Sequence, residues 1–278
     1  MDSPYFFCFG YEKSGTTFLQ LILDEHPELA CPNEVSLSFF FDSFPKVFKD
    51  FNTQIFEFNN VKGLPNEKIF LLDKSFIKNF TKEAVFKILN EYKKDKNVRL
   101  VGVKDNEFLP FFSERFRLFN QEKFIFIVRD PRSIAISLYH HNLRLYANEG
   151  QDYSKKTTID ETLFSVMERF NTQVSLVLEY LDSLSGERIL VIKYEDLLVD
   201  FEKITGQIFD FLKVKNNKEL TKEIKENTKF SKFQDGKFFR KGSTDEWHKI
   251  LKPKTQQKVI DYGGEILKYF GYTTEIKN

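Results

Sequence analysis

The most constraining feature of the sequence is a short loop between two glycines near its beginning. Residues 5–9 form an apolar run typical of a buried parallel strand, and helical spacing of apolar residues begins at about Thr16. Gly10 and Gly15 bound the loop between these elements. Glycine permits backbone angles that point successive N–H groups inward, and a helix N-terminus carries partial positive charge. The stretch therefore predicts a phosphate site.

The lysine of this loop does not stand where an ATP-binding loop needs it. The glycine spacing matches the start of a Walker A loop, which then requires Lys followed by Ser or Thr, but Thr16 and Thr17 follow Gly15 here. The lysine is Lys13, inside the loop, from where it can reach the bridging side of a 5′-phosphate. A small-molecule kinase is thus disfavoured, and a plain glycine turn stays open as the alternative for this stretch.

The run Lys-Ser-Gly-Thr-Thr at residues 13–17 resembles the 5′-phosphosulfate loop of sulfotransferases that use 3′-phosphoadenosine 5′-phosphosulfate (PAPS). Cytosolic members have Pro before the lysine and Trp after the threonines, where this chain has Glu12 and Phe18. Phe18 can still stack on adenine, whereas Glu12 places negative charge near an anion site. The resemblance implies donor-binding roles for Lys13, Ser14, Gly15, Thr16, Thr17 and Phe18.

A second motif follows the apolar run 123–128, where Arg129, Asp130 and Pro131 precede a helix that carries Ser137. An arginine at a strand end offers a planar fork to phosphate, and a serine two helical turns later can donate its hydroxyl to the same group. The alternative is a surface ion pair between Arg129 and Asp130. The motif resembles the family's 3′-phosphate motif, which implies that Arg129 and Ser137 bind the 3′-phosphate.

Three later segments are similar to the donor site of the same family. They are Tyr-Glu-Asp-Leu at 194–197, Thr-Lys-Phe at 228–230, and a basic Arg-Lys-Gly loop at 240–242 before Trp247. The first two resemble segments near adenine, and the third resembles a loop that closes on the 3′-phosphate. The implied donor-binding residues are Tyr194, Thr228, Phe230, Arg240, Lys241 and Gly242.

The general base of cytosolic members is a histidine after the second strand, and this chain has Lys104 and Asp105 there. The stretch from 24 to 34 instead resembles the tyrosylprotein sulfotransferase branch, which implies Glu34 as the base. In that branch a Lys-Asp pair also follows the second strand, so Lys104 and Lys13 are expected to stabilise the transferred group. Asp73 and Asp105 remain alternative bases.

The wider pattern predicts an α/β fold, a P-loop NTPase-like three-layer arrangement with a central, mostly parallel sheet in one domain over 1–278. Further strands are expected at 99–103, 123–128 and 188–193, with 69–72 as a weaker candidate. Residues 26–72 are otherwise expected to form short helices and loops. Later helices are predicted at 81–94 (starting at Thr81), 131–146, 159–184, 200–213, 217–227 and 254–269.

Composition excludes some partners. Lys plus Arg (42) balance Asp plus Glu (41), so nucleic acid or an acidic membrane is not expected as a partner. Two cysteines, no signal peptide and no apolar run long enough for a membrane span favour the cytoplasm. The four histidines are dispersed, so no metal site is expected. The 33 phenylalanines are interpreted as core filling.

Together these features predict a PAPS-dependent sulfotransferase that transfers a sulfuryl group to a hydroxyl of a small molecule, glycan or peptide and releases 3′-phosphoadenosine 5′-phosphate (PAP). No metal is expected, because one bridging oxygen leaves and Lys13 can neutralise its charge. Two alternatives remain: a P-loop small-molecule kinase, and a module that binds PAP without catalysis.

Overall fold

The computed structural model describes residues 3–32, 36–63, 65, 69–93, 97–181, 187–229 and 246–276. Its centre is a five-stranded sheet in the order β2-β3-β1-β4-β5, in which every pairing is parallel. The strands are β1 (Tyr5–Gly10), β2 (Leu29–Ala30), β3 (Leu100–Lys104), β4 (Lys123–Val128) and β5 (Ile189–Lys193). The predicted α/β fold with a central parallel sheet is confirmed.

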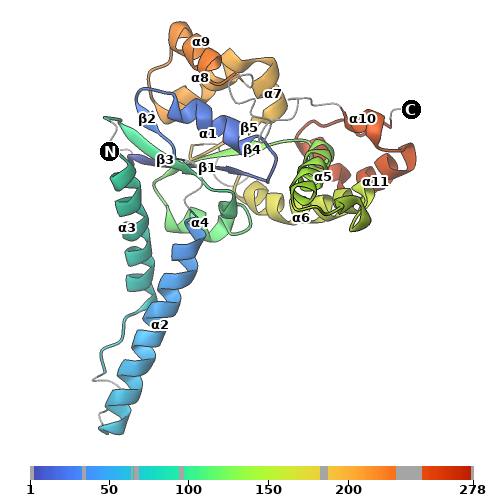
Figure 1. Ribbon diagram of the computed structural model, residues 1–278. Coiled ribbons are helices and arrows are strands. Elements are labelled where there is room, and N and C mark those ends of the chain that lie inside the picture. The colour runs from blue at the N-terminus through green and yellow to red at the C-terminus, as the bar shows by residue number, and fades with distance from the viewer. Residues whose placement is uncertain are drawn as a thin grey trace.

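Both faces of the sheet are covered by helices (Figure 1). Helices α1, α7, α8 and α9 lie on one face, and α4 and α6 lie on the other. The flanking helices are α1 (Thr16–Asp24), α4 (Phe112–Leu118), α5 (Pro131–Asn148), α6 (Ile159–Leu181), α7 (Tyr194–Val199), α8 (Phe201–Leu212), α9 (Lys218–Asn227), α10 (Trp247–Ile250) and α11 (Pro253–Tyr269), with short 3₁₀ turns η2 (Asn106–Phe108) and η3 (Tyr153–Lys155). None of the described helices is both long and apolar enough to cross a membrane.

Strand β1 divides the apolar core into two clusters because successive side chains of a strand point to opposite faces. Phe7 and Phe9 pack with β4, α4 and α6 residues, while Phe6 and Cys8 pack with residues of α1 and α8. Gly102 of β3 admits the Phe6 ring, since a Cβ there would lie 2.3 Å from a ring atom. The central strand is therefore buried on both sides, as its apolar sequence predicts.

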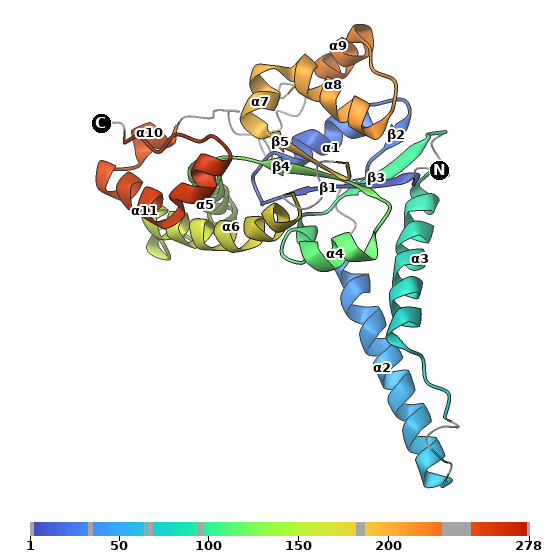
Figure 2. The ribbon, with the colours of Figure 1, turned by 180° about the vertical axis from the view of Figure 1, so that it is seen from behind.

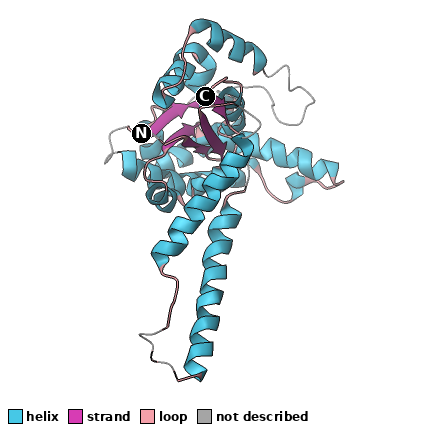
Figure 3. Cartoon of the chain, turned by 90° about the vertical axis from the view of Figure 1, so that its left-hand side faces the viewer, coloured by secondary structure: helices cyan, strands magenta, loops and turns pink. Residues whose placement is uncertain are grey.

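The largest departure from expectation is a helical arm formed by α2 (Ser38–Val61) and α3 (Lys74–Lys93). Figures 1 and 2 show the two helices side by side and projecting from the sheet, and Figure 3 shows the same hairpin from the side. The prediction of short helices and loops over 26–72 is wrong there: α2 has 24 residues and includes Pro45, which reads as a helix breaker in sequence.

Two local predictions in the arm are also wrong. Residues 69–72 do not form a strand. Helix α3 begins seven residues before Thr81, because Asp73 caps it by accepting a hydrogen bond from the Phe76 N–H at 2.7 Å. Thr81 lies inside the helix, where its hydroxyl donates to the Ile77 carbonyl at 2.9 Å.

Phenylalanines hold the two helices of the arm together, outside the sheet core. Phe48 contacts Phe76 and Phe80 edge to face at centroid distances of 5.6 and 5.0 Å, and Phe44 contacts Phe80 at 5.3 Å. Such ring pairs add about 0.5–1.5 kcal/mol beyond area burial. The interpretation of phenylalanine as core filling is thus correct for the sheet and incomplete for the arm.

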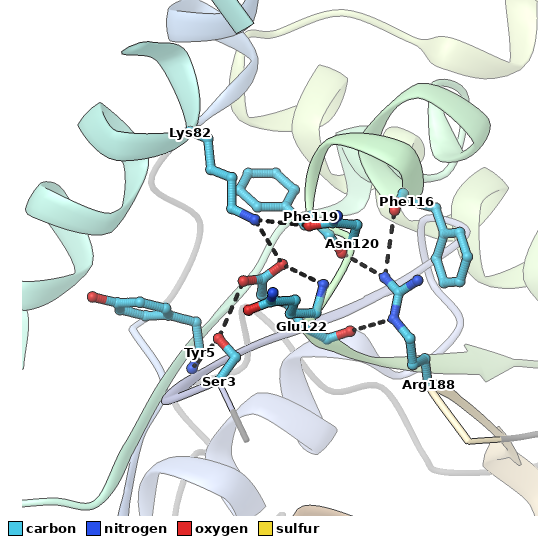
Figure 4. Close-up of polar contacts among 9 residues, drawn as sticks. Ser3, Tyr5, Lys82, Phe116, Phe119, Asn120, Glu122 and Arg188 are labelled. Atoms are coloured by element: carbon cyan, nitrogen blue, oxygen red, sulfur yellow. Dashed lines mark hydrogen bonds and ion pairs between the residues drawn. The ribbon is translucent and has the colours of Figure 1, made fainter. Parts of the chain in front are cut away.

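A buried carboxylate fixes the arm to the body of the molecule (Figure 4). Glu122, just before β4, is 2% exposed and accepts from Ser3 Oγ at 3.1 Å and from Lys82 Nζ of α3 at 3.4 Å. Lys82 also donates to Asn120 at 3.2 Å. On the other side, Arg188 donates to the Glu122 carbonyl at 3.2 Å. The middle of α3 is therefore joined to the residues just before β4.

We expect Lys82→Met to destabilise the protein by about 1–3 kcal/mol, because it leaves the buried Glu122 carboxylate without its ion-pair partner, while partial solvent access of Lys82 limits the effect. Urea unfolding measures the change. The matched control is Lys78→Met, one turn earlier and exposed, which should change the unfolding free energy by less than about 0.5 kcal/mol. Equal effects of the two substitutions would contradict an anchoring role for Glu122.

Candidate functional site

The loop between β1 and α1 has the backbone shape of an anion site. Lys13 and Gly15 have left-handed φ angles of 65° and 92°, and the Ser14 N–H donates to the Tyr11 carbonyl at 3.1 Å. Gly15 is the N-cap of α1 and supplies no side-chain cap for the first N–H groups. The Ser14 hydroxyl is buried and has no hydrogen-bond partner among the described residues. A phosphate group fits these unused donors.

Two neighbouring strands restrict this loop to glycine at both ends. A Cβ on Gly15 would lie 2.2 Å from the ring of Tyr194, the first residue of α7 after β5. A Cβ on Gly10 would lie 2.4 Å from the Ile127 carbonyl oxygen of β4. The loop is thus packed directly against the carboxyl ends of β4 and β5, where ligands of parallel α/β sheets bind.

Arg129 follows β4 and contacts the loop itself. Its Nη1 donates to the Lys13 carbonyl at 3.0 Å, and its guanidinium carbon lies 4.7 Å from the centroid of the Tyr194 ring. Arg129 is buried, at 9% exposure, so the alternative of an exposed surface ion pair is not what the structure shows. The predicted 3′-phosphate and 5′-phosphate residues are brought side by side.

Asp130 holds the following arginine instead. Its carboxylate pairs with Arg132 Nη2 at 2.6 Å and caps α5 by accepting from the Arg132 N–H at 2.9 Å. The Arg132 guanidinium is fully buried, lies 3.6 Å from the Trp247 ring centroid, and donates to the Thr273 carbonyl at 2.9 Å. Asp130 and Arg132 therefore fix the start of α5, the helix on which Ser137 lies half-buried.

A half-buried carboxylate on α7 joins the start of that helix to this turn. Glu195 accepts from the Asp130 N–H at 3.0 Å and from the Tyr272 hydroxyl at 3.1 Å. Burial raises the pKa of Glu195 above its ordinary value and does the same for the Tyr194 and Tyr272 hydroxyls. The two tyrosines are therefore neutral at physiological pH, and Tyr272 acts as the donor to Glu195.

Lys104, the lysine predicted to stabilise the transferred group, is the last residue of β3, the strand next to β1. Lys104 is 3% exposed and stands opposite Cys8 of β1 in the sheet. The next residue, Asp105, accepts hydrogen bonds from the N–H groups of Leu37 and Glu107 at 3.2 and 3.0 Å. Because both carboxylate oxygens of Asp105 accept hydrogen bonds from backbone N–H groups, Asp105 is better suited to positioning the segment at Leu37 than to accepting a proton.

Of the two other residues predicted as possible general bases, the structure describes Asp73 but not Glu34. Asp73 caps the end of α3 that points along the arm, away from the sheet (Figure 1). Glu34 lies outside the described residues. Among the described residues, His26 is buried against Phe209 and bonded to the Lys215 carbonyl at 2.8 Å, so it has a structural role.

Four predicted donor-binding residues also lie outside the described part of the chain: Phe230, Arg240, Lys241 and Gly242. Thr16 and Thr17 begin α1, and Thr16 is 4% exposed. The Phe18 ring packs on Phe201 with 6.2 Å between the ring centroids, and Phe18 is only 6% exposed. Little of the ring is therefore free for adenine, and stacking on adenine stays a prediction. Thr228 ends α9 and donates its hydroxyl to the Ile224 carbonyl at 2.8 Å.

A cavity of about 500 Å³ opens beside the loop. Its lining residues come from four parts of the chain: Gly10, Tyr11, Glu12, Ser36, Ser38, Asp105, Asn106, Glu107, Leu109, Pro110, Arg169 and Gln173. Sequence reasoning missed Arg169 and Gln173, which lie one turn apart on α6 in a stretch without a motif. Both residues reach the cavity only through the three-dimensional fold. Arg169 also forms an ion pair with Glu12 of the loop at 3.6 Å.

No three His, Cys, Asp or Glu residues lie close enough to hold a metal ion in the parts of the chain that the structure describes. The cation next to the anion loop is instead supplied by side chains, Lys13 and Arg129. His141 on α5 has a pKa lowered mainly by burial, with further lowering from the positive charge of Lys13. It is therefore mostly neutral at pH 7.

Comparisons with known proteins give a consistent result. The family model described as "Sulfotransferase domain" matches residues 3–271. A protein-tyrosine sulfotransferase of Drosophila melanogaster is 22% identical over 215 residues, covering 77% of this chain and 38% of that protein. The chain spans half or less of the length of the curated relatives it matches.

Solved structures share the fold. A mouse sulfotransferase complexed with PAP has a TM-score of 0.58 at 19% identity, covering 96% of this chain and 89% of that one. The sulfotransferase domain from the curacin biosynthetic pathway has a TM-score of 0.60 at 19% identity, covering 98% of this chain and 99% of that one. At 19% identity these similarities show the fold alone. The candidate site is therefore argued from the contacts of residues in this chain.

We expect Gly15→Ala to destabilise the protein more than Gly150→Ala. Both glycines have positive φ, so each substitution should cost about 1–2 kcal/mol in backbone strain. Only at Gly15 does the new Cβ collide with Tyr194, whereas nothing lies within 4 Å at Gly150, so the collision should add at least about 1 kcal/mol. Chemical denaturation of both variants measures the difference, and equal losses would show that Tyr194 does not restrict the loop.

Proposed function

Because this chain belongs to the sulfotransferase family, as the match over residues 3–271 shows, we propose that it transfers a sulfuryl group from PAPS to a hydroxyl acceptor and releases PAP. The observation that carries the proposal is the contact between the 5′-phosphate loop and the 3′-phosphate arginine. Arg129 donates to the Lys13 carbonyl, so two anion-binding groups share one wall of the site. A nucleotide with separate 5′ and 3′ phosphates needs this arrangement.

The donor would be held mainly by the ends of three adjacent strands. Residues 13–17 follow β1, Lys104 ends β3 and Arg129 follows β4. Neighbouring strands are about 4.8 Å apart, so the three ends span only about 10 Å. The backbone N–H groups at the start of α1 and the Ser14 hydroxyl suit the 5′-phosphate, while Arg129 and Ser137 suit the 3′-phosphate.

In the proposed reaction the acceptor oxygen forms a bond to sulfur as the bond from sulfur to the bridging phosphate oxygen breaks. Lys13 neutralises the charge that develops on that bridging oxygen, and Lys104 stabilises the transferred group. Glu34 takes the proton of the acceptor hydroxyl. Asp105 is the alternative base, although its bonds to two backbone N–H groups favour a positioning role.

Other parts of the proposal rest on the sequence. We propose one domain over 1–278 and a cytoplasmic protein, the latter supported by the low cysteine count. The rival readings are an ATP-dependent kinase and a PAP-binding module without catalysis. The position of Lys13 inside the loop argues against the kinase. The module is distinguished only by an assay, since it would bind PAP and transfer nothing.

We expect PAP to bind tightly in the presence of a metal chelator and ATP to bind poorly, because the loop and Arg129 suit separate 5′ and 3′ phosphates. Isothermal titration calorimetry measures both. Arg129→Ala should weaken PAP binding roughly 10-fold to 150-fold, through loss of charged hydrogen bonds. Arg117→Ala, on α4, is the matched control. Comparable ATP affinity, or a strict need for magnesium, would favour the kinase.

We expect Glu34→Gln to lower kcat by roughly 10²–10⁴ with little change in PAP affinity, since a general base acts on the acceptor and not on the donor. Steady-state transfer from labelled PAPS, together with PAP titration, separates the two effects. His141→Ala is the comparison, and it should keep most of the turnover. Near-normal kcat in Glu34→Gln would assign the base to Asp105 or Asp73 and leave the donor site unchanged.

A further inference from the structure

The chemical class of the acceptor can be inferred from the cavity beside the loop, and this inference rests on the proposed function. The cavity lies against Gly10, Tyr11 and Glu12 of the anion loop, which is where a hydroxyl has to approach the donor. Its volume of about 500 Å³ is within the range of small-ligand sites. It therefore has room for an acceptor of the size of a small saccharide or short peptide.

The walls of this cavity are unusually polar for a small-molecule site. Pockets for drug-like ligands are lined mostly by apolar and aromatic side chains. Here nine of the twelve lining residues have side chains with polar or charged groups: Tyr11, Glu12, Ser36, Ser38, Asp105, Asn106, Glu107, Arg169 and Gln173. An apolar phenol or sterol would leave these groups without hydrogen bonds, which opposes its binding.

Two buried polar atoms in the walls can bond a ligand. The Asn106 Oδ1 atom is buried and makes no hydrogen bond to a described residue, and the Tyr11 hydroxyl is buried next to Arg169. Burial raises the pKa of Tyr11 to about 12, so this hydroxyl stays protonated and can donate. A buried polar group without a hydrogen bond is unfavourable, and a ligand with hydroxyl groups would supply the bond that Asn106 lacks.

The charge of the walls limits the choice further. Three carboxylates face one guanidinium in the lining. Arg169 is engaged by Glu12 at 3.6 Å, and Asp105 is engaged by two backbone N–H groups. Glu107 is exposed at the cavity and adds negative charge that neither of these contacts balances. An anionic acceptor would meet like charge there.

We propose that the acceptor is an uncharged, hydroxyl-rich molecule of the saccharide class, in contrast to an acidic tyrosine peptide or an apolar phenol. Saccharide hydroxyls both donate and accept, so they can bond Asn106, Gln173 and the serines of the cavity at once. They add no negative charge next to Glu107. One of these hydroxyls then lies at the anion loop as the group to be sulfated.

The test uses the full chain with labelled PAPS and four acceptors at equal concentration: lactose, maltose, a peptide with tyrosine between acidic residues, and 2-naphthol. We expect kcat/KM for at least one disaccharide to exceed the values for the peptide and the naphthol by tenfold or more. Transfer that prefers the peptide or the naphthol would overturn the inference and leave the proposed function standing. Transfer to none of the four while PAP still binds is the result expected of a PAP-binding module, and it would overturn the proposed function together with the inference, as would failure of PAP to bind.

A charge reversal provides a second test. Glu107→Lys should raise kcat/KM for the acidic peptide relative to lactose by roughly tenfold, because it removes like charge from the cavity wall. The matched control is Glu114→Lys, whose residue lies on α4, is exposed and does not line the cavity. An unchanged ratio in Glu107→Lys, or an equal change in Glu114→Lys, would show that this wall does not select the acceptor.

Discussion

The site depends on one packing constraint, the contact of the anion loop with the ends of β4 and β5. The loop keeps two left-handed residues, Lys13 and Gly15, because Tyr194 covers Gly15 and Arg129 holds the Lys13 carbonyl. Tyr194 and Arg129 also contact each other, so the three groups restrict one another. The anion site is therefore formed before any ligand binds, which reduces the ordering cost of binding.

The contacts that support these groups are buried and lead to the end of the chain. Asp130 is held by Arg132, which in turn contacts Trp247 and the Thr273 carbonyl, while Glu195 is held by Tyr272. Removing one member of such a network leaves buried polar groups unpaired. Trp247 of α10 and the segment after α11 are thus far from the loop in sequence and yet support the turn that carries Arg129.

The positions of the predicted donor-binding residues at one edge of the sheet could be predicted from the sequence for a physical reason. In a parallel sheet the carboxyl ends of all strands lie on one edge, so a basic residue just after an apolar run is placed without knowledge of the rest of the fold. Lys13 and Arg129 obey this rule and come together, and Lys104 ends the neighbouring strand β3. The order of the strands, with β1 between β3 and β4, makes them neighbours.

The helical arm of α2 and α3 could not be predicted in the same way, although the sequence contains a helical pattern of phenylalanines there. Phe40, Phe44 and Phe48 recur every four residues, which is helical spacing, but Pro45 interrupts the pattern and Phe41 is the only residue of α2 that is buried. The partner helix α3 starts after Asp73, which caps it, and no apolar run in the sequence marks this start. Pairing between two exposed helices depends on contacts such as Phe48 with Phe80, which sequence spacing does not reveal.

The proposed acceptor cavity is hard to predict, because helices and loops line it in addition to the ends of β1 and β3. Arg169 and Gln173 on α6 meet Asn106 and Glu107 on η2 across the cavity, and these elements are about sixty residues apart in sequence. A helix can rotate or slide by a fraction of a turn without losing its core packing, whereas a strand end is fixed by sheet register. In the proposed reaction, the donor chemistry would therefore stay constant in this architecture while changes in the cavity walls alter the choice of acceptor.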